Sequence, residues 1–371
     1  MILKIFLFWR LGLFLITYLG SMTIPLVANG GIGAIGPNRK FDFWASWAQW
    51  DGGHFYNISK FGYFEPNQYA FFPLFPLFIK IGSYPLLGSH LLSGLLIANV
   101  LYLAFLYTFF RLVHLKFGQK TAVASLFTVV LFPTSFFSVA FYSESLLLIL
   151  TALTLLLLER NKPYLASITI ILATLTRFVG IFLVLPLIFY LLKSVNFKLR
   201  KINLRFLSIP ISLSGVLGYG AFLYLKFKDP FYFFTVQSTW HRSVVSPLST
   251  VYSYLSQNFT SKPYNDYLDI IATVSFVLIL IAGVKKIPLS WILFGLLVVI
   301  VPASSGTLTS MPRYVLASLP AFVLIGMFLK DRRILSILIW VIFFPPILSN
   351  ADAVAAPYPV GASNVTEGAD V

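Results

Sequence analysis

Long apolar stretches that carry almost no charge run through nearly the whole chain. Only 11% of its 371 residues are Asp, Glu, Lys or Arg, whereas soluble globular domains carry about 25%. So few charged side chains cannot coat a surface that faces water. The sequence therefore predicts an integral membrane protein that crosses the bilayer several times.

Eleven apolar segments are predicted to be helices of an all-α, polytopic bundle, because about 20 apolar residues in a helix cross the hydrocarbon core. Several of the segments are only 14–16 residues long. Those beside Glu144 and Arg177 are therefore either short hairpin helices or kinked longer ones. The predicted spans are residues 5–27, 91–110, 121–141, 144–158, 163–176, 178–192, 206–225, 266–283, 288–303, 314–329 and 334–349.

The composition also excludes several classes of function. The chain has no Cys, which rules out a disulfide framework, a thiolate metal site and a cysteine nucleophile. A net charge of +15 would suggest nucleic-acid binding in a soluble protein, but the 27 Lys and Arg residues are scattered between apolar runs. Such scattering is typical of a topology signal, so we expect no nucleic-acid partner.

The distribution of charge predicts a cytoplasmic N-terminus. This orientation places most Lys and Arg, including Lys4 and Arg10, in cytoplasmic segments. Residues 5–27 are interpreted as a retained first span, because no small-x-small cleavage site closely follows them. Of the 12 acidic residues, only Glu159 and Asp331 fall on the cytoplasmic side. Because acidic residues contribute little to orientation, their concentration outside predicts that the outer face, extracytoplasmic or lumenal, carries the activity.

Two long connections lie on the predicted outer side, at residues 28–90 and 226–265, whereas the cytoplasmic connections are short. No internal repeat is visible. We therefore predict one membrane domain over residues 1–350. The polar, small-residue-rich tail at 351–371 is predicted to be disordered.

The first outer loop is too aromatic for a solvated loop and too charged for a span. Trp44, Trp47 and Trp50 are spaced so that a helix would place them along one side. This pattern predicts an amphipathic helix at the depth of the lipid headgroups, although an ordinary aromatic belt explains the Trp residues equally well.

Asp51 directly follows this aromatic stretch. Gly52 and Gly53 come next and allow close approach of the backbone, and His54 lies three residues on. An acid where an amphipathic helix meets an apolar bundle is partly desolvated, which raises its pKa and suits it to accept a proton. The alternative is a helix-capping Asp beside a turn.

This part of the chain resembles the signature of the PIG-V family, the GPI mannosyltransferase 2 type of GT-C glycosyltransferase, and the short, Phe-, Ile- and Lys-rich chain favours a prokaryotic relative. At motif level the resemblance covers the first half of the chain, and beyond it only the architecture and the Arg313 region agree. The specific matches are Trp50-Asp51-Gly52-Gly53-His54-Phe55, Gly62-Tyr63 and Ala70-Phe71-Phe72-Pro73-Leu74-Phe75-Pro76; the looser ones are Tyr142-Ser143-Glu144-Ser145, Thr176-Arg177 and Pro312-Arg313-Tyr314.

The resemblance implies a GT-C-type bundle and an inverting enzyme that takes mannose from a polyprenyl-phosphate carrier outside the cytoplasm. It also implies that an Asp of the first outer loop is the general base, and the matching position is Asp51. The acceptor would be a glycolipid or another membrane-proximal glycan. This chemistry needs a carboxylate to take the proton of the attacking hydroxyl, and cationic groups to stabilise the leaving phosphate.

Arginines and an acid within apolar segments are the candidates for binding the substrates. Arg177 is the only charged residue in 165–192, and Glu144 the only one in 121–158; such residues are usually functional. We expect Arg177 or Arg313 to contact the lipid-linked phosphate, unless Arg177 is a snorkelling residue or pairs with Glu144. Glu144 either binds the acceptor, orients a cation or belongs to a structural ion pair.

Trp240, His241 and Arg242 are adjacent in the second outer loop, and Tyr314 follows Arg313. We predict that these residues help to bind the sugar and the phosphate, because aromatic faces pack against pyranose rings. The alternative is an interfacial aromatic belt with a solvated charged pair.

No obligatory metal or other cofactor is predicted. His54, His90 and His241 fall in the two outer loops together with Asp51, but their spacing is a weak signal for a metal site.

Two other classes of function remain open. A transporter or flippase of lipid-linked sugars would be expected to show internal repeats and binding groups near the bilayer midplane. A non-catalytic subunit of a glycan-assembly complex would tolerate single changes at Asp51, Arg177 and Glu144. Within the enzyme class, the donor sugar could be another hexose or a pentose.

Overall fold

The computed structural model describes residues 1–23, 43–256 and 264–332. These residues form α-helices joined by short 3-10 turns, and none of them lies in a β-strand, which confirms the predicted all-α fold. The α-helices are α1 (Ile2–Thr23), α2 (Asp51–Phe61), α3 (Leu74–Ser83), α4 (His90–Phe117), α5 (Gln119–Val130), α6 (Glu144–Glu159), α7 (Pro163–Thr176), α8 (Val184–Ser194), α9 (Ser208–Phe227), α10 (Tyr232–Thr235), α11 (Pro247–Ser256), α12 (Tyr264–Ala282), α13 (Leu289–Ala303), α14 (Met311–Tyr314) and α15 (Leu319–Leu329).

Four helices among the described residues are long and apolar enough to cross a membrane. They comprise Ile2–Met22, His90–Phe117, Leu204–Phe227 and Asn265–Ala282, and a fifth candidate is the pair Met311–Ala317 and Leu319–Leu329, which is bent by 84°. The protein is therefore a multi-pass membrane protein.

The predicted number of eleven spans is not confirmed. The helix expected over 121–141 ends at Val130, and the segments at 163–176 and 288–303 form shorter apolar helices. Helices of this length suffice inside a bundle because neighbouring helices, rather than lipid, cover their ends. The predicted span at 334–349 and the tail at 351–371 lie outside the described residues.

The core of the bundle surrounds α6, which packs against α4 and α7. Almost every side chain of α6 is buried, as expected for a helix that is apolar on all sides. One of its few polar contacts joins Thr154 Oγ1 to Thr169 Oγ1 of α7, at 2.7 Å. The N-terminal end of this central helix carries Glu144.

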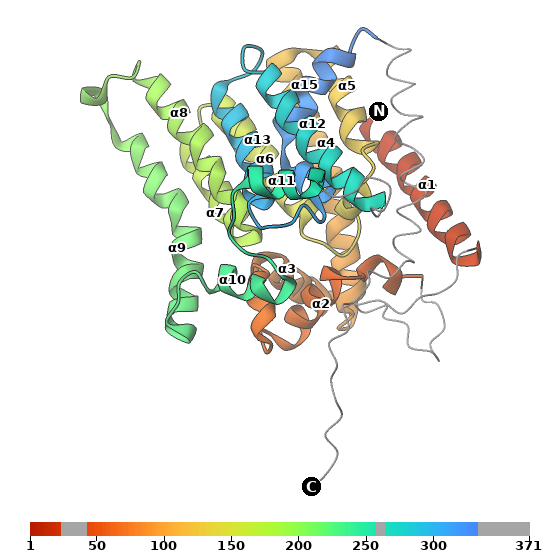
Figure 1. Cartoon of the computed structure of the whole chain (residues 1–371). Helices are drawn as coiled ribbons and strands as arrows, with labels where there is room; N and C mark the ends of the chain where they lie inside the picture. Colours follow the sequence, from red (N-terminus) through yellow and green to blue (C-terminus); the bar gives the residue numbers. More distant parts are fainter. Residues whose placement is uncertain (24–42, 257–263, 333–371) are drawn as a thin grey trace.

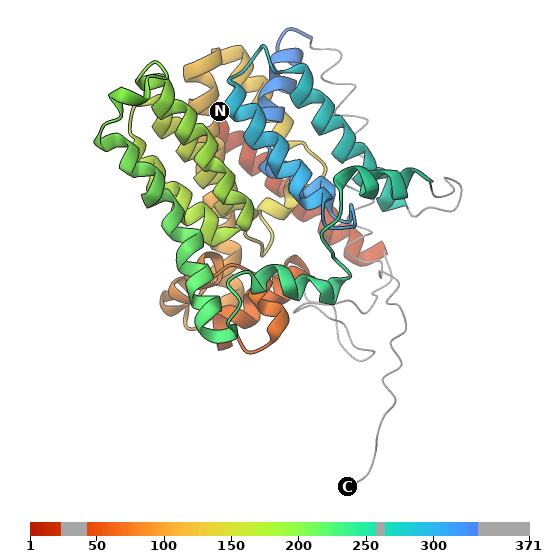
Figure 2. The same cartoon turned by 60° about the vertical axis from the view of Figure 1, so that its left-hand side comes forward.

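Helices α2 and α3 of the first outer loop and α10 of the second form a layer beneath the bundle, across the ends of the longer helices (Figures 1 and 2). The amphipathic helices expected here are α2 and α3. The helix expected through Trp44, Trp47 and Trp50 is not formed, because only Ala45–Ala48 is helical, as the 3-10 helix η1. Trp50 has φ 49°, which a helix cannot accommodate.

Two ion pairs mark the opposite end of the bundle. Lys116 at the end of α4 pairs with Glu159 at the end of α6, and Lys120 in the first turn of α5 pairs with Asp331. The sequence predicts Glu159 and Asp331 on one side, and the two pairs do share one end of the bundle. Arg10, which the sequence also predicts on the cytoplasmic side, has its side chain buried against Trp47 of the first outer loop.

Candidate active site

Asp51 opens α2 directly after a strained turn. Trp50 has φ 49° and ψ −119°, a region that residues other than Gly rarely adopt and that costs roughly 1–3 kcal/mol. The turn is closed by hydrogen bonds from the N–H of Gly52 to the carbonyl of Gln49 at 2.9 Å and from Gly53 to Trp50 at 3.0 Å. The side chain of Asp51 remains 34% exposed at this turn.

The segment that precedes α6 is docked on this turn. The N–H of Phe141 donates to the carbonyl of Trp47 at 2.8 Å, and the hydroxyl of Tyr142 donates to the carbonyl of Gln49 at 2.6 Å. A Cβ atom on Gly52 would lie 3.3 Å from the carbonyl oxygen of Phe141. The close approach expected from this glycine is therefore confirmed, and it brings the start of α6 next to Asp51.

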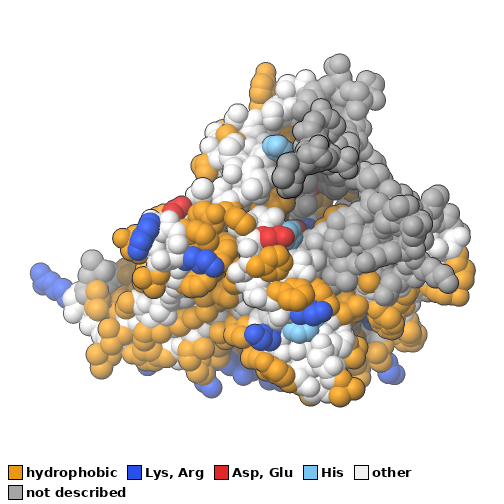
Figure 3. All heavy atoms as spheres, turned by 90° about the horizontal axis from the view of Figure 1, so that it is seen from below, with side chains coloured by type: hydrophobic (Ala, Val, Ile, Leu, Met, Phe, Trp, Pro, Cys, Tyr) orange, Lys and Arg blue, Asp and Glu red, His pale blue; other side chains and the backbone are white. Residues whose placement is uncertain are grey.

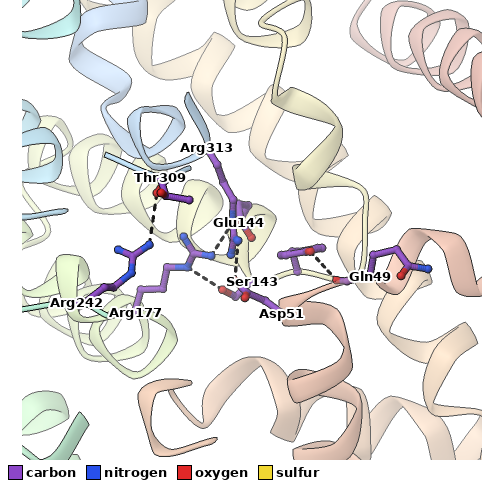
Figure 4. Close-up of polar contacts among 9 residues, drawn as sticks. Gln49, Asp51, Ser143, Glu144, Arg177, Arg242, Thr309 and Arg313 are labelled. Carbon is purple, nitrogen blue, oxygen red and sulfur yellow. Dashed lines mark hydrogen bonds and ion pairs between the residues drawn. The ribbon is translucent and has the colours of Figure 1, made fainter. Parts of the chain in front are cut away.

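Four charged side chains meet where these segments come together (Figure 4). Arg313 Nη1 lies 2.6 Å from Asp51 Oδ2, and Arg313 Nε also donates to Glu144 Oε1. Arg177 Nη2 donates to the same Glu144 oxygen at 2.6 Å, and Arg177 Nε donates to Ser143 Oγ at 3.0 Å. We refer to Asp51, Glu144, Arg177 and Arg313 as the charged cluster.

The members of the charged cluster differ in burial. The exposed fractions of the side chains are 4% for Glu144, 8% for Arg313, 18% for Arg177 and 34% for Asp51. Two carboxylates and two guanidinium groups balance in charge, as buried ions require. Glu144 holds both arginines through one oxygen, while its Oε2 is buried without a hydrogen-bond partner among the described residues. Glu144 and Arg313 thus form the buried part of the cluster, and Arg177 and Asp51 form its more accessible part.

Arg313 reverses the pKa shift expected for Asp51. Burial alone would raise the pKa of this carboxyl, but Arg313 and, to a smaller degree, Arg177 hold it below its ordinary value. The expectation of a raised pKa is therefore wrong, because the sequence does not reveal the partner. Burial lowers the pKa of the nearby His54, so its imidazole is neutral at pH 7.

Aromatic side chains from both outer loops form one side of the site. His54 lies one turn after Asp51 on α2 and stacks on Phe71, with ring centroids 4.7 Å apart and planes inclined by 20°. Trp240, at the end of the 3-10 helix Val236–Trp240, contacts both rings edge-on at 5.9 and 6.0 Å. Its side chain remains 37% exposed. We refer to His54, Phe71 and Trp240 as the aromatic wall.

The other predicted substrate-binding residues are Arg242 and His241 of the second outer loop and Tyr314 of α14. Arg242 donates to Ser305 Oγ at 3.2 Å and to the carbonyl of Thr309 at 3.4 Å. Tyr314 lies between two cations, because its ring centroid is 5.7 Å from the guanidinium carbon of Arg242 and 5.9 Å from that of Arg313. His241 is exposed, and its imidazole makes no hydrogen bond or ion pair with the described part of the chain.

Arg313 is held in position by two residues that are not among the candidates predicted from the sequence. Asp269 Oδ1 accepts a hydrogen bond from the N–H of Met311 at 3.0 Å, and the hydroxyl of Thr134 donates to the carbonyl of Pro312 at 2.7 Å. Asp269 is only 4% exposed within α12. An acid inside a predicted span was a usable signal, whereas nothing in the sequence points to Thr134.

The face that carries α2 and α3 has acidic and His side chains at its surface near the middle (Figure 3). Within residues 1–23, 43–256 and 264–332, no group of three or more His, Cys, Asp and Glu side chains is arranged to hold a metal ion. The carboxylates of the charged cluster already bind guanidinium groups. The independence from metal that we expect stays a prediction.

Comparison with protein families identifies a match over much of the chain. Residues 33–278 match a family described as Mannosyltransferase (PIG-V). Among curated proteins, GPI alpha-1,6-mannosyltransferase 2 from Homo sapiens is 32% identical over 146 residues, and the protein of the same name from Cricetulus griseus is 33% identical. Each match covers 36% of this chain and 29% of the relative, so the chain matches less than a third of their length.

Among solved structures, the chain resembles ArnT from Cupriavidus metallidurans, which was crystallised with undecaprenyl phosphate. The TM-score is 0.52 at 15% sequence identity, and the match covers 88% of this chain and 60% of that one. At this identity the similarity concerns the fold, and it supports the expected GT-C-type bundle.

Proposed function

The chain belongs to the PIG-V mannosyltransferase family, and from this premise we propose that it transfers mannose from a polyprenyl-phosphate carrier to a glycolipid or another membrane-proximal glycan. The charged cluster carries the proposal, since it combines a partly exposed carboxylate with two arginines in one site. A glycosyl phosphate needs both kinds of group, a base for the acceptor and cations for the leaving group.

Asp51 is the general base of the proposed reaction. The acceptor hydroxyl oxygen attacks the anomeric carbon from the face opposite the phosphate and forms the new glycosidic bond. As the bond between the anomeric carbon and the phosphate oxygen breaks, the hydroxyl proton passes to Asp51 and the phosphate leaves with its lipid. Arg313 binds Oδ2 of Asp51, so we assign the proton to Oδ1. The configuration at the anomeric carbon is inverted.

Arg177 and Arg313 are the proposed phosphate contacts. A guanidinium group binds phosphate through two parallel hydrogen bonds. The side chain of Arg177 is 18% exposed and that of Arg313 is 8% exposed, which favours Arg177 as the first contact of an incoming phosphate. Glu144 holds both groups in place through Oε1, so we assign it an orienting role.

The aromatic wall is the proposed sugar subsite. Trp240 offers an exposed ring, and the neutral His54 and Phe71 stack behind it. Arg242 and Tyr314 extend this side toward Arg313, and His241 is assigned to the periphery. Mannose as the donor sugar follows from the family, since no described contact distinguishes the hydroxyl orientations of hexoses.

We place this site on the outer, extracytoplasmic or lumenal side, with the N-terminus in the cytoplasm. The pairs Lys116–Glu159 and Lys120–Asp331 support this orientation, because they gather basic groups at the end of the bundle opposite Asp51. The charged cluster lies at the end of the bundle that carries Asp51. This location also favours a transferase over a transporter, which is expected to bind its cargo near the bilayer midplane.

Transfer can be measured with purified protein in lipid vesicles that contain a radiolabelled polyprenyl-phosphate mannose and a membrane glycolipid extract. Asp51→Asn is expected to lower transfer by about 10²- to 10⁴-fold. Asp331→Asn, which changes an exposed acid at the other end of the bundle, is the matched control and should retain activity. Normal transfer by Asp51→Asn would refute the proposed base.

The same vesicles distinguish the alternatives. Movement of labelled lipid between leaflets without formation of a glycosidic bond would favour a flippase. Mass spectrometry of membrane glycolipids, with and without the protein, would identify the acceptor as the lipid that lacks one hexose. If that lipid lacks a pentose instead, the donor sugar is a pentose and not mannose.

A further inference from the structure

Arg10 lies within the apolar helix α1, and its side chain is buried in the protein. It is only 6% exposed. Its guanidinium carbon lies 4.0 Å from the ring centroid of Phe14 and 4.0 Å from that of Trp47. Phe14 is one turn further along α1, whereas Trp47 belongs to η1 in the first outer loop. The guanidinium group therefore contacts a ring of its own helix and a ring of the segment that leads to Asp51, and these two rings also meet edge to face with centroids 5.8 Å apart.

The described residues offer this cation no conventional partner. Among the described residues Arg10 forms no ion pair, and its buried Nε and Nη1 atoms make no hydrogen bond. Burial of an unpaired charge is unfavourable, and ionisable groups inside membrane helices are rare and usually functional. The attraction of the two aromatic faces for the cation is the interaction that the structure offers in compensation.

Trp47 connects Arg10 to the base. Its carbonyl accepts the hydrogen bond from the N–H of Phe141, in the segment that precedes α6. Three residues later the strained Trp50 leads into Asp51. A strained turn persists only when its surroundings hold it in place. Arg10 contacts this segment from α1, whereas Phe141 and Tyr142 contact it from the segment that precedes α6.

We propose that Arg10 is a positioning residue, which clamps Trp47 and thereby holds the turn at Trp50 so that Asp51 faces the charged cluster. The inference rests on the proposed role of Asp51 as the base. Arg10 itself touches neither the charged cluster nor the aromatic wall in the described contacts. Its effect on the reaction is exerted through the position of Asp51.

Kinetics of Arg10→Met test this role, because Met keeps an apolar chain of similar reach and removes the cation. We expect kcat to fall roughly 10- to 100-fold, as a displacement of about 1 Å in a reacting group can cost that much. KM for the donor should stay within about twofold, because the phosphate contacts are unchanged. Arg10→Lys keeps the charge without the planar face and should fall between Arg10→Met and the wild type.

A double-mutant cycle separates the clamp from a general loss of stability. If Arg10 acts through Trp47, the double variant Arg10→Met, Trp47→Leu should lose less activity than the product of the two single effects. Arg111→Met is the matched control, since Arg111 is exposed and, within the described part of the chain, stacks only on Tyr107 of its own helix, at 5.8 Å. Its effect should be small and should multiply with that of Trp47→Leu.

A spin label measures the clamp without any transfer assay. The chain has no Cys, so Ser46→Cys provides a single attachment site for a nitroxide within η1. Arg10→Met should increase the mobility of this label and leave unchanged a label at Leu87→Cys, which is fully exposed in the turn before α4. Absence of transfer by the wild type would refute the proposed function while the label still tests the clamp.

The proposal is overturned if Arg10→Met leaves both kcat and the mobility of the label at Ser46→Cys unchanged. It is also overturned if the two single effects multiply in the double variant. Should Arg10→Met fail to fold, Trp47→Phe in combination with Arg10→Lys gives the same cycle with smaller changes. Wild-type kcat and label mobility in both of those single variants would then count against the clamp.

Discussion

Arg313 Nη1 lies 2.6 Å from Asp51 Oδ2, although 262 residues separate the two in the chain. The same guanidinium group also donates to Glu144, and Tyr142 packs against it with its ring centroid 4.6 Å from the guanidinium carbon. The candidate base is thus bound by a cation that is itself fixed on two further sides. This arrangement keeps Asp51 ionised in the absence of substrate.

Arg313→Gln is predicted to change the pH dependence of transfer. The pKa of Asp51 lies below its ordinary value, so the wild type should keep its activity as the pH falls from 7 toward 5. Removal of the cation leaves burial as the main influence and raises the pKa, so the acidic limb of kcat/KM moves to higher pH in the variant. Rate measurements across this range check the shift, and an acidic limb at the same pH in both proteins would contradict it.

The stability of the fold should also decrease as the pH falls. The folded-state pKa of Asp51 is depressed, so its ion pair with Arg313 stabilises the fold at pH values above the ordinary Asp pKa. That contribution is lost as the pH falls through the lower folded-state value. Thermal unfolding in detergent at neutral and at acidic pH should therefore show a wild-type advantage over Asp51→Asn that shrinks in acid.

Glu144→Ala is predicted to destabilise the protein strongly. Its removal leaves Arg177 and Arg313 without their shared buried acceptor, and loss of one partner from a buried ion pair costs about 3–5 kcal/mol. Glu159→Ala is the control, because its pair with Lys116 is more exposed and should contribute roughly 1 kcal/mol or less. Denaturation in detergent compares the two, and equal losses would be inconsistent with the arrangement described.

Arg177→Lys is predicted to weaken binding of the donor phosphate. Lys supplies a point charge but cannot form two parallel hydrogen bonds, and one charge-assisted bond is worth about 1.5–3 kcal/mol, which corresponds to roughly 10- to 150-fold in affinity. Binding of undecaprenyl phosphate to the purified protein measures this directly. Lys193→Arg, an exposed change at the end of α8, should leave that affinity unchanged.

Trp240→Ala is predicted to weaken sugar binding and to leave the base intact. A single aromatic contact contributes about 0.5–1.5 kcal/mol, which corresponds to a rise in KM of roughly 2- to 13-fold. Trp240→Phe should recover most of this loss. Tyr252→Ala, which removes an exposed ring on α11, is the control, and an equal effect of both alanine variants would argue against the aromatic wall as a sugar subsite.

Asp269 provides a test of how Arg313 is positioned. Asp269→Asn keeps an oxygen that can accept from the N–H of Met311 and should be mild. Asp269→Leu leaves that donor buried and unpaired, which costs about 1–3 kcal/mol and should lower kcat by displacing Arg313. If Asp269→Leu has wild-type kinetics and stability, the hydrogen bond to Met311 does not hold α14 in place.

The candidate site could be predicted from the sequence where its signal is local. Asp51 stands out because an acid, two glycines and a histidine follow an aromatic run within a few residues. Arg177 and Glu144 stand out because each is the only charge in a long apolar stretch. The sequence left open whether Arg177 pairs with Glu144, and only the distance of 2.6 Å between them answers this.

Predictions failed where the answer depended on a distant partner. The shift in the pKa of Asp51 was assigned the wrong sign because Arg313 is remote in sequence. The packing of Arg10 against Trp47 could not be predicted, because charge patterns report orientation but not the depth at which a side chain packs. The expected helix through the Trp residues is broken at Trp50 by a backbone conformation that only the surrounding contacts stabilise.

The sequence by itself determined that this chain lies in a membrane, that it is helical and that it resembles the PIG-V family, because hydrophobicity and short motifs are properties of neighbouring residues. The tertiary structure decided which charges meet. The charged cluster draws Asp51, Glu144, Arg177 and Arg313 from four separate elements, and its electrostatics follow from distances of a few ångströms that no local pattern encodes. With charges so sparse, the packing of the helices determines the chemistry of each one.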